Sequence, residues 1–196
     1  MPLPQEFVDF HSSWTAKATS YTDSTARSCF DHFLTQYVIY NRLYCEATLR
    51  LSRNADSGIA LLGKASFPDS SAAKSYVAQF LGAGNLIESL ESNDVCLNAI
   101  AELKRILVDR QFIVNLHPVT GAWQEGEDDK LLVLLNSTSR AKRADAILKY
   151  IYCIRCNMMH GQKGFSESQV VLLKPIIAIL EKICSLLYCK LNITDA

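Results

Sequence analysis

The chain has 196 residues, nearly half of them apolar, and its twenty basic and twenty acidic side chains cancel. This length suits a single domain with a sizeable core. The charge balance excludes a general polyanion binder, so any contact with nucleic acid has to be local. The most apolar tract, 169–191, is broken by Lys174, Pro175, Glu181 and Lys182, so no membrane span is expected.

The first residues, MPLPQEFVDF, contain no basic stretch followed by an apolar run, so they do not predict a signal peptide. Seven cysteines without an export signal favour a reducing compartment and free thiols. We therefore expect a cytoplasmic protein.

Helical periodicity dominates the chain, and no alternation of apolar and polar residues predicts a strand. The expected helices cover about residues 4–19, 22–53, 70–80, 84–91, 93–114, 129–136, 139–160 and 166–191. The second is expected to be capped at Thr22 and Asp23, and the last to be kinked at Pro175. Residues 54–70 and 117–129 are expected to be a connector and a surface loop. The pattern predicts one all-α domain over residues 1–196, an antiparallel helical bundle.

Two polar residues interrupt the apolar stripes of two expected helices. Arg155 lies four residues after Ile151, inside the stripe of 139–160, and Asn41 lies four residues after Tyr37 in that of 22–53. A buried guanidinium needs a partner or an opening to solvent. The alternative for Arg155 is a place at the stripe edge with its long stem reaching water, and for Asn41 a bond to neighbouring backbone. Together, Arg155 and Asn41 suggest a polar pocket shared by the two helices.

The end of the helix 139–160 offers two incompatible sites. Cys153, Cys156 and His160 share one face of a continuous helix, which is a partial zinc site that Cys184 or Cys189 would complete. Arg155 and His160, by contrast, point about 140° apart on such a helix. They act together only if the helix breaks or if a second subunit supplies the counterpart. His160 alone is also compatible with a simple interaction with the helix C-terminus.

A basic cluster lies at the start of the same helix, and further polar residues follow the end of the helix. Arg140, Lys142 and Arg143 lie in its first turns, where they suit either a solvated face or phosphate attraction. Gln162 and Lys163, just past His160, are further candidates for contact with an anion.

The stretch YCIRCNMMHGQK, 152–163, resembles the signature of HEPN domains, α-helical nucleases and nucleotide-binding modules of prokaryotic defence and stress systems. Their motif is an arginine followed after four to six residues by a histidine, matched by Arg155 and His160. The preceding LLVLLNSTSRAKRADAILKYIY and the segment FDHFLTQYVIYNRLY, 30–44, also look like parts of such domains. The resemblance covers about half the chain and leaves 54–116 unexplained. Gln162 stands where one subfamily carries a tyrosine, which argues against regulation by nucleotide transfer onto that residue.

The resemblance implies metal-independent RNA cleavage, without a cofactor, at a composite site formed by a homodimer. His160 would act as general base, Arg155 would stabilise the phosphorane, and Asn157 would orient the histidine or the phosphate. Such a protein would be a toxin or phage-defence effector, with a neutralising or regulatory protein partner. Two alternatives stay open: a non-catalytic HEPN module that binds RNA, a nucleotide or a partner protein, and a zinc-stabilised helical interaction domain.

Overall fold

The computed structural model describes residues 3–61, 66–117, 119–159 and 167–193. Within these ranges the chain is all-α, and the only extended pairing is an isolated antiparallel bridge between Leu116 and Trp123. The expectation of an all-α bundle is therefore confirmed. None of the helices in the described ranges combines the length and the hydropathy needed to cross a bilayer.

The N-terminal part consists of two long helices and a short turn. They are α1 (Gln5–Thr19), α2 (Ala26–Arg53) and the 3₁₀ turn η1 (Ala55–Ser57). The expected cap at Thr22 and Asp23 is wrong, because the Thr25 side chain accepts the hydrogen bond from the Ser28 backbone N–H at 3.2 Å. Asp23 instead accepts bonds from the Thr25 backbone and hydroxyl, so it stabilises the capping residue.

The middle of the chain forms shorter helices. A broken helix comprises α3 (Asp69–Ser71), the π-helical turn η2 (Ala72–Tyr76) and α4 (Val77–Leu81), and it is followed by α5 (Ala83–Glu91) and α6 (Asp94–Val108). Helix α6 ends earlier than expected because Arg110 takes a left-handed backbone conformation, with φ of 51°.

The C-terminal part contributes α7 (Glu125–Leu135), α8 (Arg140–Met159), the 3₁₀ turn η3 (Glu167–Gln169) and α9 (Val170–Asn192). Helix α7 begins inside the expected surface loop: Glu125, Glu127 and Asp128 occupy its first turn, where acidic side chains favour a helix start. Pro175 lies inside α9, in its second turn.

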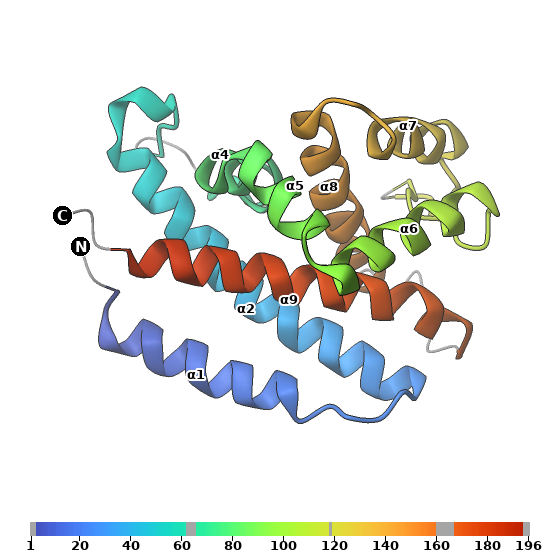
Figure 1. The fold of residues 1–196 in the computed structure, drawn as a ribbon, viewed down its shortest axis with the longest axis horizontal. Coiled ribbons are helices and arrows are strands. Elements are labelled where there is room, and N and C mark those ends of the chain that lie inside the picture. The colour runs from blue at the N-terminus through green and yellow to red at the C-terminus, as the bar shows by residue number, and fades with distance from the viewer. Residues whose placement is uncertain (1–2, 62–65, 118, 160–166, 194–196) are drawn as a thin grey trace.

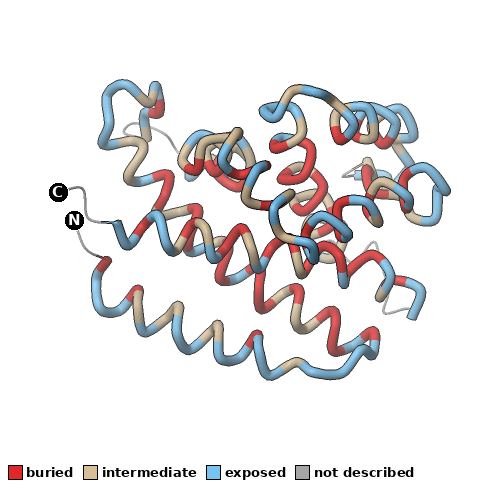
Figure 2. Tube along the Cα trace, viewed as in Figure 1, coloured by how far each residue is buried: buried red, intermediate tan, exposed pale blue. Residues whose placement is uncertain are grey.

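Helices α2 and α9 form the most extensive pair, and α1 packs along α2, so these three make one side of the bundle (Figure 1). Helix α8 packs against α5, α7 and the π-helical turn. The buried sides of α2, α8 and α9 meet in a continuous apolar core (Figure 2). Within α2, the rings of Tyr37, Tyr40 and Tyr44 contact one another edge to face, with centroids 5.6 and 5.2 Å apart.

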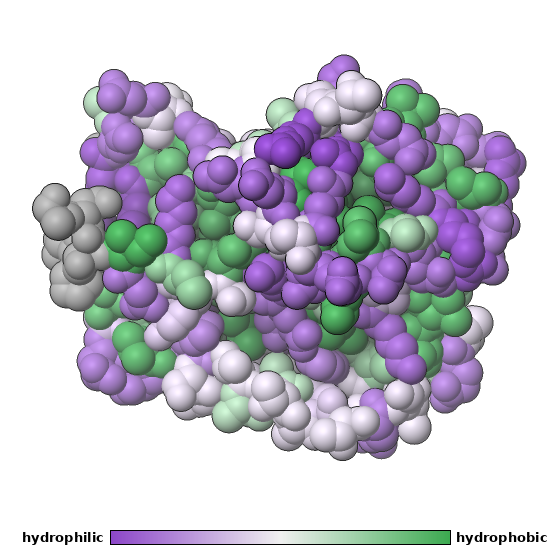
Figure 3. Space-filling model, in the orientation of Figure 1, coloured by the Kyte–Doolittle hydropathy of each residue, from purple (hydrophilic) through white to green (hydrophobic). Residues whose placement is uncertain are grey.

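The π-helical turn fixes the segment that precedes it. Tyr40 donates a hydrogen bond to the Ala73 carbonyl at 2.5 Å, and Ala72 and Ala73 are fully buried. This contact holds Asp69, the first residue of α3, between α2 and α8. On the face shown in Figure 3, polar and apolar residues are interspersed, as a chain of balanced charge allows.

Candidate functional site

Arg155 and Asn41 line the same pocket, as their places in two apolar stripes predict. The pocket has a volume of about 430 Å³ and lies between α1, α2 and the last turns of α8. Its lining residues are Phe10, Leu34, Tyr37, Val38, Asn41, Arg42, Cys45, Arg155 and Met159. We call it the Arg155 pocket.

The Arg155 guanidinium lies between aromatic rings and one carboxylate. Its central carbon is 5.5 Å from the centroid of the Tyr37 ring and 6.0 Å from that of Tyr152. One terminal nitrogen is 4.0 Å from the Asp69 carboxylate. Burial lowers the pKa of Arg155, but the Cys156 sulfur, Tyr37 and Asp69 together raise it more, so this pKa lies above its ordinary value. The side chain keeps a fixed positive charge and remains about a quarter exposed.

Asp69 is the anchor of this arrangement. It accepts a short hydrogen bond from the Tyr44 hydroxyl and a longer one, 3.5 Å, from Tyr152. Asn41 donates to the Tyr44 hydroxyl at 2.7 Å, so a chain of contacts runs from Asn41 through Tyr44 and Asp69 to Arg155. Burial, and then the bond to Asp69, raise the pKa of Tyr44. Its hydroxyl therefore stays protonated and continues to donate.

The lining of the Arg155 pocket is electropositive. Among the described residues it contains two guanidinium groups, from Arg42 and Arg155, and no carboxylate. Arg42 is exposed and lies with its central carbon 5.0 Å from the centroid of the Phe7 ring. The hydroxyl of Tyr37 is buried and has no hydrogen-bond partner within the described ranges, which is uncommon for a buried donor. The pocket thus offers two fixed positive charges to an anion.

Two residues of this site were absent from the candidates that the sequence suggested. Arg42 follows Asn41 directly but falls outside the apolar stripe of α2, so periodicity gives it no distinction. Asp69 lies in the segment that the family resemblance leaves unexplained. Its contact with Arg155 depends on how α3 packs against α2 and α8, and no local pattern signals that contact.

Asn157 does not reach the Arg155 pocket. It is 4% exposed, and its side-chain amide donates to the Val114 carbonyl at 2.9 Å. Two residues along a helix rotate a side chain by about 200°, which takes Asn157 to the side of α8 opposite Arg155. We therefore leave it out of the candidate site and assign it to the attachment of the 114–117 segment.

The basic cluster lies at the other end of α8. Arg140 pairs with Glu88 at 3.2 Å, and Arg143 pairs closely with Glu91. Lys142 is exposed. Fifteen residues of helix separate Arg140 from Arg155, roughly 22 Å along the axis. This distance places the cluster outside the Arg155 pocket, and its attraction of phosphate stays a prediction.

His160, Gln162 and Lys163 lie outside the described residues. Helix α8 is described as far as Met159, which precedes His160 in the sequence and lines the Arg155 pocket. The first residue of the arginine–histidine motif and the residue before its histidine therefore lie at one pocket.

Burial raises the pKa of two of the thiols considered for a zinc site. Cys153 donates to the Asn115 side-chain oxygen at 3.4 Å, and burial raises the pKa of its thiol to about 11. Burial raises the pKa of the Cys184 thiol to about 12. The described ranges, which do not include His160, contain no group of three potential ligands placed to hold an ion, and the zinc alternative stays a prediction.

Comparisons with protein-family models, with curated proteins and with solved structures find no match. The function proposed below therefore rests on the motif and on the geometry of the Arg155 pocket.

Proposed function

We propose that this protein is a HEPN-type endoribonuclease that cleaves RNA without a metal ion, at a site completed by homodimerisation. One observation carries the proposal: the motif arginine lines an open pocket whose described lining contains a second arginine and no carboxylate. In a chain of zero net charge, this local concentration of positive charge is the kind of feature that RNA binding requires.

The pocket supplies the groups that phosphodiester cleavage needs. A guanidinium matches two phosphate oxygens and stabilises the extra charge of a phosphorane. Arg155 is held for this purpose by Asp69 and by the Tyr37 ring, while the more exposed Arg42 suits a neighbouring phosphate.

His160 is proposed as the general base. A neutral imidazole takes the proton from a ribose 2′-hydroxyl, whose oxygen attacks the adjacent phosphorus. The bond from phosphorus to the 5′-oxygen then breaks, and that oxygen takes up a proton. The products are a 2′,3′-cyclic phosphate and a 5′-hydroxyl, so atoms and charge balance without an added water or metal.

A second subunit is proposed because the run YCIRCNMMHGQK, which carries Arg155 and His160, occurs once in the chain; Arg27–His32 and Arg110–His117 share only the spacing. The rim of the pocket is apolar as well as basic: Val38 and Met159 are exposed there, Met159 by 61%. Apolar side chains around a charged centre suit a surface that another copy covers, with the two pockets facing one groove.

The test is cleavage of single-stranded RNA in EDTA by the purified protein. We expect cleavage that leaves 2′,3′-cyclic phosphate ends, and we expect His160→Ala to abolish it. His117→Ala, which changes a histidine that does not line the Arg155 pocket, is the matched control and should retain activity. Cleavage at the original rate by His160→Ala contradicts the assignment.

A non-catalytic RNA-binding module is the second candidate, and the Asp69 contact favours it. A carboxylate already 4.0 Å from Arg155 balances part of its charge, as in a pocket that binds an anion without chemistry. This candidate predicts RNA binding without cleavage, and equal binding by the parent protein and His160→Ala.

A further inference from the structure

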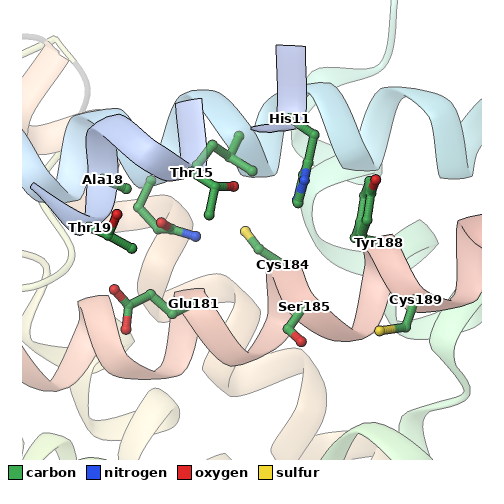
Figure 4. Close-up of a pocket in the computed structure, with 11 residues that line it drawn as sticks. His11, Thr15, Ala18, Thr19, Glu181, Cys184, Ser185, Tyr188 and Cys189 are labelled. Carbon is green, nitrogen blue, oxygen red and sulfur yellow. The ribbon is translucent and has the colours of Figure 1, made fainter. Parts of the chain in front are cut away.

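A second hollow lies on the other side of α1, between α1 and α9, with α2 as its floor (Figure 4). Its volume is about 370 Å³, within the range of small-molecule sites. Figure 4 shows Thr15 and Thr19 of α1 opposite Glu181, Cys184 and Ser185 of α9. Apart from Glu181 these side chains are short, and for that reason the two helices leave a space between them. We call this space the α1/α9 groove.

One end of the groove is closed by an aromatic contact. The rings of His11 and Tyr188 stack with centroids 3.6 Å apart and planes 7° from parallel, which ties α1 to α9. Burial lowers the pKa of His11, so its imidazole is neutral near pH 7. This end of the groove therefore carries no positive charge.

The other end carries the one carboxylate of the lining, that of Glu181. Its nearest charged or titratable neighbour within the described ranges is His32, whose Nε2 is 3.0 Å from the carboxylate but is not aligned for a hydrogen bond. Within the part of the chain that the structure describes, no lysine or arginine lines the groove. Glu181 can therefore accept hydrogen bonds from a ligand.

The remaining polar atoms also suit a donor. Gln36, 5% exposed, contributes an amide from the floor of the groove, and Thr15 and Ser185 contribute hydroxyl groups. An ammonium group has three N–H donors and no acceptor, so it needs several oxygens around it. A carboxylate, an amide oxygen and hydroxyl oxygens provide them, while Ile39 and Tyr188 provide apolar surface for the rest of a ligand.

We propose that the α1/α9 groove binds a small organic cation, a primary amine with an apolar or aromatic body. The ammonium group lies against Glu181 and Gln36, and the body lies along Ile39 towards Tyr188. This site is separate from the Arg155 pocket and does not depend on the ribonuclease assignment.

The test is calorimetric binding at about pH 8, where imidazoles are generally neutral, with 2-phenylethylamine as the probe. 3-Phenylpropionate has the same ring and chain but carries a carboxylate, so it is the matched ligand control. We expect the amine to bind, and at ten times its Kd to raise Tm by roughly 3–5 °C. We expect no binding of the acid. Absence of amine binding at millimolar concentration, or equal binding of both probes, overturns the proposal.

Two variants locate the site. Glu181→Gln removes the charge and should weaken amine binding at least tenfold, while Asp129→Asn, an exposed acid on α7, should leave it unchanged. Ser185→Leu narrows the groove from its exposed wall and should abolish binding without lowering Tm. Because Ser185→Leu keeps Glu181, this variant tests the groove even if Glu181→Gln disturbs His32. Amine binding that survives in both folded variants overturns the assignment to this groove.

Discussion

Both ends of α8 carry arginines, but the acidic residues near them are placed differently. Arg140 and Arg143 at its start are paired with Glu88 and Glu91 of α5, whereas Arg155 near its end lines a pocket whose described lining contains no carboxylate. The positive charge at the start of the helix is neutralised by its neighbours. The positive charge of Arg155, near the end of the helix, has Asp69 on one side and the open space of the Arg155 pocket on the other. The position of the acidic partners therefore separates a structural arginine from a candidate functional one.

The largest effect should come from removing the arginine of the pocket. We expect Arg155→Ala to reduce RNA cleavage by about 100- to 1000-fold, because charge on the phosphorane loses its stabilising guanidinium. Arg140→Ala, at the paired end of the same helix, should change the rate by less than about twofold. Initial rates in EDTA measure both. Similar losses in the two variants would erase the distinction between the two ends of α8.

The anchor behind Arg155 should have the next largest effect. Asp69→Asn keeps an acceptor for Tyr44 but removes the charge beside the guanidinium. We expect kcat to fall about tenfold with KM nearly unchanged, since orientation rather than substrate binding is lost. Asp69→Glu should recover part of the rate. Faster cleavage by Asp69→Asn would instead mean that Asp69 competes with the phosphate.

Arg42 should affect RNA binding more than the chemical step. Arg42→Ala should weaken RNA binding by roughly threefold to tenfold and lower the slope of log Kd against log salt by about 0.7, the value for one contact to single-stranded nucleic acid. Arg143→Ala, already paired with Glu91, is the control and should leave that slope unchanged. Fluorescence anisotropy over a range of salt concentrations measures both, and an unaltered slope in Arg42→Ala removes Arg42 from the site.

The smallest effect concerns the paired end. A double-mutant cycle on Arg143 and Glu91 should give a coupling energy below about 1 kcal/mol in urea unfolding, because the pair is partly exposed. Cleavage by the folded variants should match that of the parent protein. A large loss of activity at equal stability would bring this end of α8 into the function.

Much of the fold could be predicted from the sequence, because the apolar periodicity of an amphipathic helix is visible in the local sequence. The stripes of α2 and α8 also placed Asn41 and Arg155 at one pocket. Helix ends were harder to predict. The left-handed backbone of Arg110 ends α6, and nothing in the local sequence pattern marks that residue for a conformation usually taken by glycine.

The candidate site could be predicted only where its residues broke a local pattern. Asn157 was misassigned because the motif shows neighbours in sequence, while the helix turns them to different sides. The pairing of Arg140 with Glu88 required knowing that α5 packs on α8. Asp69 reaches Arg155 through the same kind of long-range packing.

The central claim, a ribonuclease site completed by two subunits, is tested most directly by the concentration dependence of cleavage. The specific rate of RNA cleavage in EDTA would be measured over a dilution series, with the dimer fraction determined at each concentration by analytical ultracentrifugation. We predict that the specific rate falls in proportion to the dimer fraction. A specific rate that stays constant as the protein becomes monomeric, or no cleavage by the fully formed dimer, would contradict the account.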